Sequence, residues 1–248
     1  MQHYLEKIIG DFECHDAEGI RDCFAHGVDP NATSSGGPLF YQLVNMYTRS
    51  PRFKDCIKAF VEYGLQFSDK VLLAVLTDDA STLAQLLQAD PAAAEKKYTL
   101  QCTYTPIFEA SLLHICAEYN HVSCAAVLLQ QGADVNAKAG VDEYGFGGQT
   151  PIFHTVNQNT NQSEEMLHWL LQHKADVLLP VRGLIWGRGY EWETLIPAVN
   201  PISYAMMGLL PQFHRREATI AQTVSLLLKH AYGIDYTPVN VPCKYLTH

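Results

Sequence analysis

The sequence predicts an all-α solenoid of short helix–turn–helix units, with β-hairpin fingers inserted between some of the units. The best-defined unit, Ser111–Asn136, reads as two short helices followed by a tight Gly-Ala-Asp turn. Comparable units recur along the chain, and the later ones are separated by long connections rich in aromatic residues and glycine. Repetition of a small helical unit predicts an open array in which each unit packs on its neighbours. An array of this kind favours binding to another macromolecule over catalysis in a closed pocket.

The best-defined unit shows the signals of both helices. Ser111 is suited to cap the first helix, because its oxygen can accept a hydrogen bond from a free backbone N–H of the first turn. Asn120 and His121 interrupt the apolar pattern, and a second helix is predicted over Val122–Gln131. Gly132 ends that helix, since glycine readily takes the left-handed conformation found at helix C-termini.

The other units repeat this order of elements. Openings that resemble Thr-Pro occur at Gly37–Phe40, Thr150–Phe153 and Asn200–Ala205, where proline fits because the first helical residue needs no N–H. Thr105–Phe108 has the same form but lies too far from the turn at Gly132, so we place it in a connecting finger. The chain is therefore read as one domain with units at about 1–36, 37–67, 68–97, 98–140, 141–180 and 181–236 and a tail at 237–248.

The Thr-Pro openings and the Gly-Ala-Asp-Val-Asn turn together resemble the ankyrin repeat. The resemblance extends over the chain as about six divergent repeats. It implies a concave groove lined by the first helices and the fingers, and a protein partner bound there. His114 occupies the position where the histidine of the family hydrogen-bonds between units.

The insertions distinguish this chain from a regular array. Val181–Asn200 is too long for a structureless connection, and we expect a β-hairpin with strands Leu184–Trp186 and Tyr190–Trp192 around Gly187–Gly189. Trp, Tyr and Arg often dominate protein interfaces. Exposed tryptophans would therefore indicate a contact surface, whereas the alternative is that they fold back over neighbouring helices. Tyr144 and Phe146 lie in a second, glycine-rich insertion.

Residues of the first helices complete the predicted surface. The resemblance to the ankyrin repeat implies, by position, that Ile115 faces the groove and that Tyr41, His154 and Tyr204 are its counterparts in other units. The alternative is that some of these side chains pack against adjacent fingers. The candidate partner-binding residues are Tyr41, Ile115, Tyr119, Tyr144, Phe146, His154, Trp186, Arg188, Tyr190, Trp192 and Tyr204.

Composition limits the kinds of partner and the compartment. The net charge is −9, from 17 basic and 26 acidic residues, and there is no basic block, so neither nucleic acid nor an anionic membrane is expected as a partner. The first residues lack the long apolar core of a secretory signal. The seven cysteines form no CxxC pair and suit a reduced cytoplasmic protein. We expect a cytoplasmic monomer, with a secreted effector as the alternative.

No pattern in the chain predicts chemistry. There is no HExxH motif, no paired zinc-type cysteines and no phosphate-binding loop, so we expect no catalytic residues, no metal and no cofactor. The favoured function is a protein-binding module, either an effector or an inhibitor that blocks a toxin. One alternative is a purely structural array. A less favoured one is an enzyme whose cleft joins His154 to a carboxylate such as Glu109 or Glu193, or whose nucleophile is Cys116.

Overall fold

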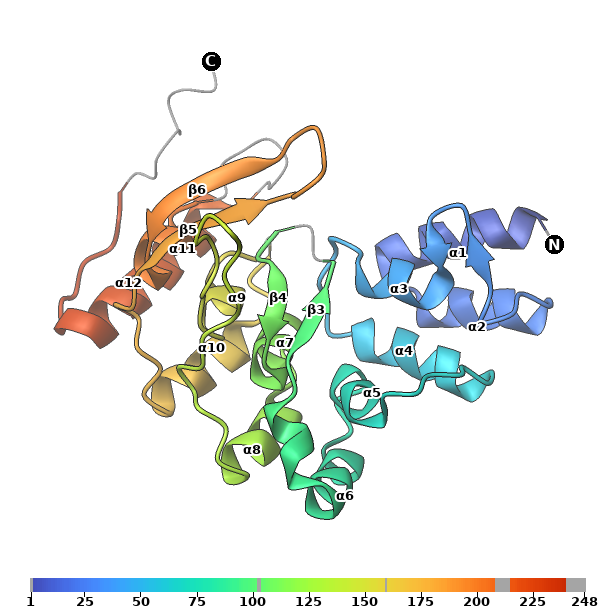
Figure 1. The fold of residues 1–248 in the computed structure, drawn as a ribbon. Coiled ribbons are helices and arrows are strands. Elements are labelled where there is room, and N and C mark those ends of the chain that lie inside the picture. The colour runs from blue at the N-terminus through green and yellow to red at the C-terminus, as the bar shows by residue number, and fades with distance from the viewer. Residues whose placement is uncertain (1, 102–103, 159, 208–214, 240–248) are drawn as a thin grey trace.

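The computed structural model describes residues 2–101, 104–158, 160–207 and 215–239. Within them the helices form six consecutive antiparallel pairs along an arc, with the hairpins on one side of it (Figure 1). The pairs are α1 (Gln2–Cys14) with α2 (Ala17–Ala25), α3 (Leu39–Val44) with α4 (Phe53–Glu62), α5 (Lys70–Leu76) with α6 (Ala80–Ala89), α7 (Leu112–Tyr119) with α8 (Val122–Gln130), α9 (Phe153–Val156) with α10 (Glu164–Gln172), and α11 (Pro201–Ala205) with α12 (Glu217–Tyr232). None of the helices in this part of the chain is long and apolar enough to cross a membrane.

Short polar side chains start many of these helices. Asp69 accepts a hydrogen bond from the Leu72 amide at the start of α5, and Asn200 accepts one from the Ser203 amide at the start of α11. Gly132, with φ of 87°, follows α8 in the left-handed region, as predicted. Lys174 takes the same role after α10 with φ of 66°, although a residue with a Cβ is strained there.

Among the described residues, three two-stranded antiparallel hairpins accompany the helices, so the helix–turn–helix solenoid with hairpin fingers is confirmed, whereas an all-α class is not. They are β1 (Thr33–Ser34) with β2 (Gly37–Pro38), β3 (Tyr98–Leu100) with β4 (Ile107–Ala110), and β5 (Val181–Trp186) with β6 (Thr194–Val199). Thr105–Phe108 does lie in a finger, as expected. The predicted strand Tyr190–Trp192 is wrong, because these residues belong to the turn and β6 begins at Thr194.

The packing departs from a strict nearest-neighbour array. The ring of Phe53 on α4 stacks on Tyr119 of α7 with centroids 4.1 Å apart, although α5 and α6 intervene in sequence. The hydroxyl of Tyr119 also donates to the Val44 carbonyl at 2.8 Å. The second and fourth helix pairs therefore touch directly, which an ordinary solenoid does not require.

The short 3-10 helix η1 (Pro91–Glu95) leads from α6 to β3.

The predicted tail begins at Thr237, but only residues 237–239 of it are described, and 240–248 lie outside the described residues. Cys102, Cys243 and His214 also lie outside them.

Candidate functional site: a groove beneath the fingers

The later fingers are joined to one another through the main chain. The Gly140 amide donates to the Phe108 carbonyl of β4 at 2.9 Å. The same segment folds back through a bridge between Val141 and Gly147, and the Gly147 amide donates to the Gly183 carbonyl of β5 at 2.9 Å. We call this succession, β3, β4, residues 139–149, β5 and β6, the finger row.

The finger row borders a groove of about 830 Å³, within the size range of ligand-binding clefts. One wall comes from the first hairpin, with Gly36, Gly37 and Pro38, and the opposite wall from β3, with Thr99 and Leu100. Its other lining residues are Tyr41, Asn45, Gln101, Pro106, Ile107, Phe108, Gly140, Val141, Asp142, Glu143, Phe146, Gly147, Gln149, Ile185 and Arg188. The groove thus spans fingers that precede four of the helix pairs.

Large apolar side chains remain exposed in and beside this groove. Tyr41 is 41% exposed and Phe108 is 40% exposed, and both line it. Tyr144 and Tyr190, at the tips of neighbouring fingers, are 63% and 47% exposed. Phe146 also lines the groove and is half-buried. Aromatic side chains gathered on one face in this way mark a surface suited to contact with another molecule.

Polar contacts hold the finger tips together. Arg188 in the turn of the last hairpin pairs with Asp142, and the Asp142 carboxylate also accepts the amides of Tyr144 and Phe146, each at 2.9 Å. Burial alone would raise the pKa of Asp142, but these amides and Arg188 lower it below its ordinary value. Trp192 is half-buried, and its ring stacks on Tyr190 with centroids 5.4 Å apart.

The predicted stripe of exposed first-helix residues is wrong for all of its members except Tyr41. Ile115, Tyr119, His154 and Tyr204 are buried, and so is Trp186 on β5. The cause is that successive first helices pack closely on one another, α7 on α9 and α9 on α11, and that the last hairpin covers α11. Trp186, 1% exposed, donates from Nε1 to the Tyr204 hydroxyl at 2.7 Å. Of the predicted residues, Tyr41, Tyr144, Arg188 and Tyr190 are exposed, while Phe146 and Trp192 are half-buried.

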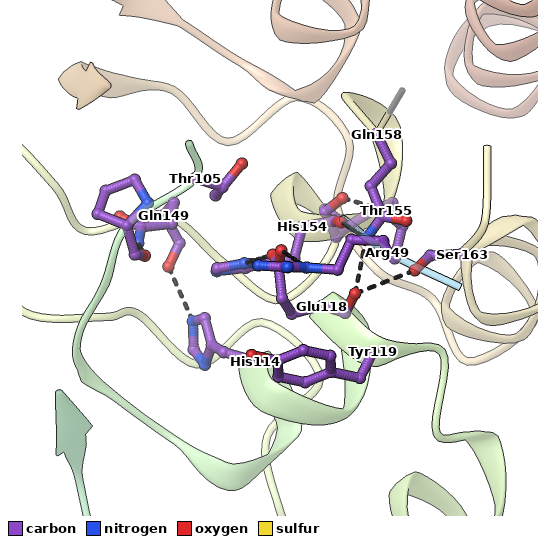
Figure 2. Close-up of polar contacts among 12 residues, drawn as sticks. Arg49, Thr105, His114, Glu118, Tyr119, Gln149, His154, Thr155, Gln158 and Ser163 are labelled. Carbon is purple, nitrogen blue, oxygen red and sulfur yellow. Dashed lines mark hydrogen bonds and ion pairs between the residues drawn. The ribbon is translucent and has the colours of Figure 1, made fainter. Parts of the chain in front are cut away.

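A buried charged cluster joins three helix pairs (Figure 2). Glu118 on α7 accepts a hydrogen bond from Arg49 Nε at 2.6 Å and pairs with His154 Nδ1 of α9 at 2.7 Å. The Arg49 guanidinium also lies over the Tyr119 ring, 4.9 Å from its centroid. Burial tends to raise the pKa of Glu118, but the charge of Arg49 and the hydrogen bond with His154 hold it below its ordinary value.

His114 has the bridging role that the repeat pattern predicts. Its Nδ1 accepts from the Ser111 amide at 3.2 Å, and its Nε2 therefore donates to the Gln149 carbonyl at 2.9 Å, across to the next unit (Figure 2). Burial, with a smaller effect of the charge of His154, lowers the pKa of His114 to about 3. The ring is thus neutral at physiological pH and acts as a structural link.

The geometry differs from the catalytic cleft considered above. His154 is buried against Glu118 and does not line the groove, whereas Glu109 and Glu193 are exposed on the fingers. Glu193 accepts the Gly189 amide at 2.8 Å within its own turn. The Cys116 thiol is buried, and burial raises its pKa well above the ordinary value, which disfavours a thiolate nucleophile.

Several residues of the site carry no signal in the sequence. The finger motif of Phe108 predicts no binding role, and nothing local to Arg49 indicates a partner almost seventy positions away. Arg215, which no motif in the sequence singles out, is buried and donates to the carbonyls of Ala205 and Val156 at 2.7 and 2.9 Å. An arginine beside a helix end is a weak signal for such a role, because helix C-termini present free carbonyls.

Comparison with known proteins adds one positive finding. Residues 71–180 match a family model described as "Ankyrin repeats (3 copies)". This range extends from the second residue of α5 through α10. A search of curated proteins found no match to the chain.

Proposed function

This chain belongs to the ankyrin-repeat family through residues 71–180, and we propose that its groove and finger tips bind a protein partner. Ankyrin repeats generally act as protein–protein interaction modules. The single observation that carries the proposal is the groove of about 830 Å³, with Tyr41 and Phe108 exposed in it. Binding would shield this aromatic surface from water, which is the main favourable term in most protein association.

The exposure of the aromatic residues supports two different roles: buried ones that stabilise the fingers, and exposed ones that contact the partner. Trp186 and Tyr204 are buried and stabilise the last hairpin. Tyr144 and Tyr190 stand exposed at the tips that this packing supports. We therefore assign contact with the partner to the exposed aromatics and to Arg188, and a supporting role to the buried ones.

The charge suggests the kind of partner. With a net charge of −9, the chain would meet a basic protein surface faster than a neutral or acidic one, because long-range attraction accelerates encounter. An inhibitor or effector that covers a basic surface of its target fits this charge. We place this action in the cytoplasm, where the free thiols of the buried Cys23, Cys56, Cys116 and Cys124 would stay reduced.

The proposal is tested by affinity capture from the native source with the full chain and two variants. The double variant Tyr41→Ala/Phe108→Ala removes the exposed rings from the groove. Tyr232→Ala is the matched control, since Tyr232 is 55% exposed on the last helix and does not line the groove.

We expect a captured partner to be lost with the double variant and retained with the control, with melting temperatures close to that of the original chain. Retention of the partner by the double variant would contradict the proposal. If no partner is captured by the original chain either, the purely structural alternative gains support.

A further inference from the structure

The finger row ends in two edges of different character. At one end is β6, where Pro197 has no N–H to donate and Ala198 has φ of 45°, outside the range of a regular strand. Proline and local distortion are devices that keep an edge strand from pairing with another chain. The β6 edge is therefore poorly suited to accept a further strand.

The other end is β3, Tyr98–Leu100. It contains no proline, and Tyr and Thr both favour strands. Among the described residues β3 pairs with β4 alone, while β4 continues the row through the bond from Gly140. The second edge of β3 thus has backbone groups available for another strand, and Thr99 on it is exposed.

The free edge of β3 borders the groove because no finger lies between β3 and the first hairpin. Each hairpin or folded segment precedes the first helix of a pair, but residues 63–69 pass from α4 to α5 without a strand. The groove lies between β3 and the first hairpin, whose Gly37 and Pro38 line its opposite wall. Pro38 has no N–H, so the β3 side is the better template.

The charges along the groove favour one kind of occupant. Three charged side chains line it, Asp142, Glu143 and Arg188, and the first pairs with the third. Glu143 is exposed and pairs with no basic residue of the described chain. The groove therefore carries one unpaired acidic side chain, Glu143, on a protein whose net charge is −9.

We propose that an extended, basic segment of the partner protein adds to the free edge of β3 and occupies the groove between β3 and the first hairpin. Main-chain hydrogen bonds to β3 would supply the pairing, and Tyr41 and Phe108 would contact alternate side chains of the added strand. A basic side chain of the segment would face Glu143. This inference rests on the proposed function of the groove and specifies the form of its ligand.

The test uses a displayed library of random linear peptides selected on the full chain, followed by an N-methyl scan of the best synthetic peptide. Methylation of a backbone nitrogen removes one donor. In an added strand only every second nitrogen faces β3, so affinity should fall at least about tenfold at alternate positions and change little between them. Hydrogen exchange of the full chain should slow at Tyr98–Leu100 and stay unchanged at Thr194–Val199.

Two variants check the charge and the edge. Glu143→Gln should weaken the selected peptide several-fold and reduce the salt dependence of its binding, whereas Glu191→Gln, also exposed but outside the groove, should not. Thr99→Pro should abolish binding. Because this variant also risks disturbing the hairpin, the N-methyl scan remains the deciding measurement.

Several outcomes would overturn the inference: no enriched peptide, an N-methyl scan without alternation, or protection that appears away from β3. If the native partner nevertheless requires Tyr41 and Phe108, the groove is a binding site but its ligand is not an added strand. If no peptide binds as an added strand and the native partner also does not require Tyr41 and Phe108, the proposed function is wrong as well.

Discussion

Replacing Arg49 by methionine tests whether the buried cluster links distant repeats. The substitution keeps much of the side-chain volume but removes the charge. It leaves the Glu118 carboxylate buried without its cationic partner, because the two side chains are only 11% and 8% exposed. Breaking a buried ion pair by removing one partner costs about 3–5 kcal/mol, since the remaining charge stays desolvated. His154 still bonds the other Glu118 oxygen at 2.7 Å, so we expect the lower end of that range, about 3 kcal/mol.

The assay is urea unfolding at pH 7, followed by circular dichroism and repeated at lower pH. Arg49 holds the pKa of Glu118 below its ordinary value of 4.5, so the stabilisation is present above that pH and is lost as the pH falls through the folded value. The deficit of the Arg49→Met variant should therefore be largest at pH 7 and narrow below pH 4.5. Adding Glu118→Gln to that variant should recover part of the loss.

The matched control is Arg21→Met. Arg21 bonds Glu62 through two nitrogens, at 2.7 and 3.0 Å, but the two side chains are 27% and 49% exposed. Water screens such a pair, and its loss should cost about 0–1 kcal/mol. If Arg49→Met costs no more than Arg21→Met, the cluster contributes nothing beyond a surface ion pair and the reasoning from burial is refuted.

Three further outcomes are expected. Because the folded pKa of His114 is about 3 against an ordinary 6.5, its contribution to stability is complete above pH 6.5 and is lost as the pH falls; urea midpoints from pH 8 to pH 5 check this, and a flat profile would contradict it. Trp186→Ala should lower the free energy of unfolding by about 3–5 kcal/mol, whereas Tyr190→Ala should change it by less than about 1 kcal/mol; equal effects would show that hairpin burial is misassigned. Gly147→Ala should destabilise more than Gly132→Ala, because both have positive φ but an added Cβ meets the Gly140 carbonyl only at Gly147; thermal melts of the two variants compare them.

The solenoid was predictable because its signals are local. A capping serine, a broken apolar pattern and a terminal glycine together predicted α7 and α8 to within one residue. The last helix, α12, likewise ends before a glycine in the left-handed region, Gly233, with φ of 69°. Each signal acts within one or two turns of helix, so a single sequence carries it completely.

The groove was less predictable because exposure depends on how neighbouring units stack. Ile115 and Tyr204 occupy repeat positions that face the groove in the pattern, yet the next first helix and the folded hairpin cover them. Tyr41 has the same repeat position and stays exposed, because no finger follows its unit directly. The difference comes from the missing finger before α5, and that absence has no residue motif of its own.

The contacts between the second and fourth helix pairs affect how the groove can bind a ligand. Phe53 and Arg49 come from the pair that follows the first hairpin, and Tyr119 and Glu118 come from α7, which follows the β3–β4 hairpin. The two walls of the groove are therefore tied together at their base, 4.1 Å apart at the stacked rings, while their upper parts lack a finger between them. A gap held open in this way needs little reorganisation to admit a ligand, and preorganisation is a main route to affinity.

It follows that Arg49→Met should weaken binding of the selected peptide as well as the stability of the fold, even though Arg49 does not line the groove. Isothermal titration under conditions where the variant remains folded measures this, and unchanged affinity would show that the walls are positioned by their own repeats.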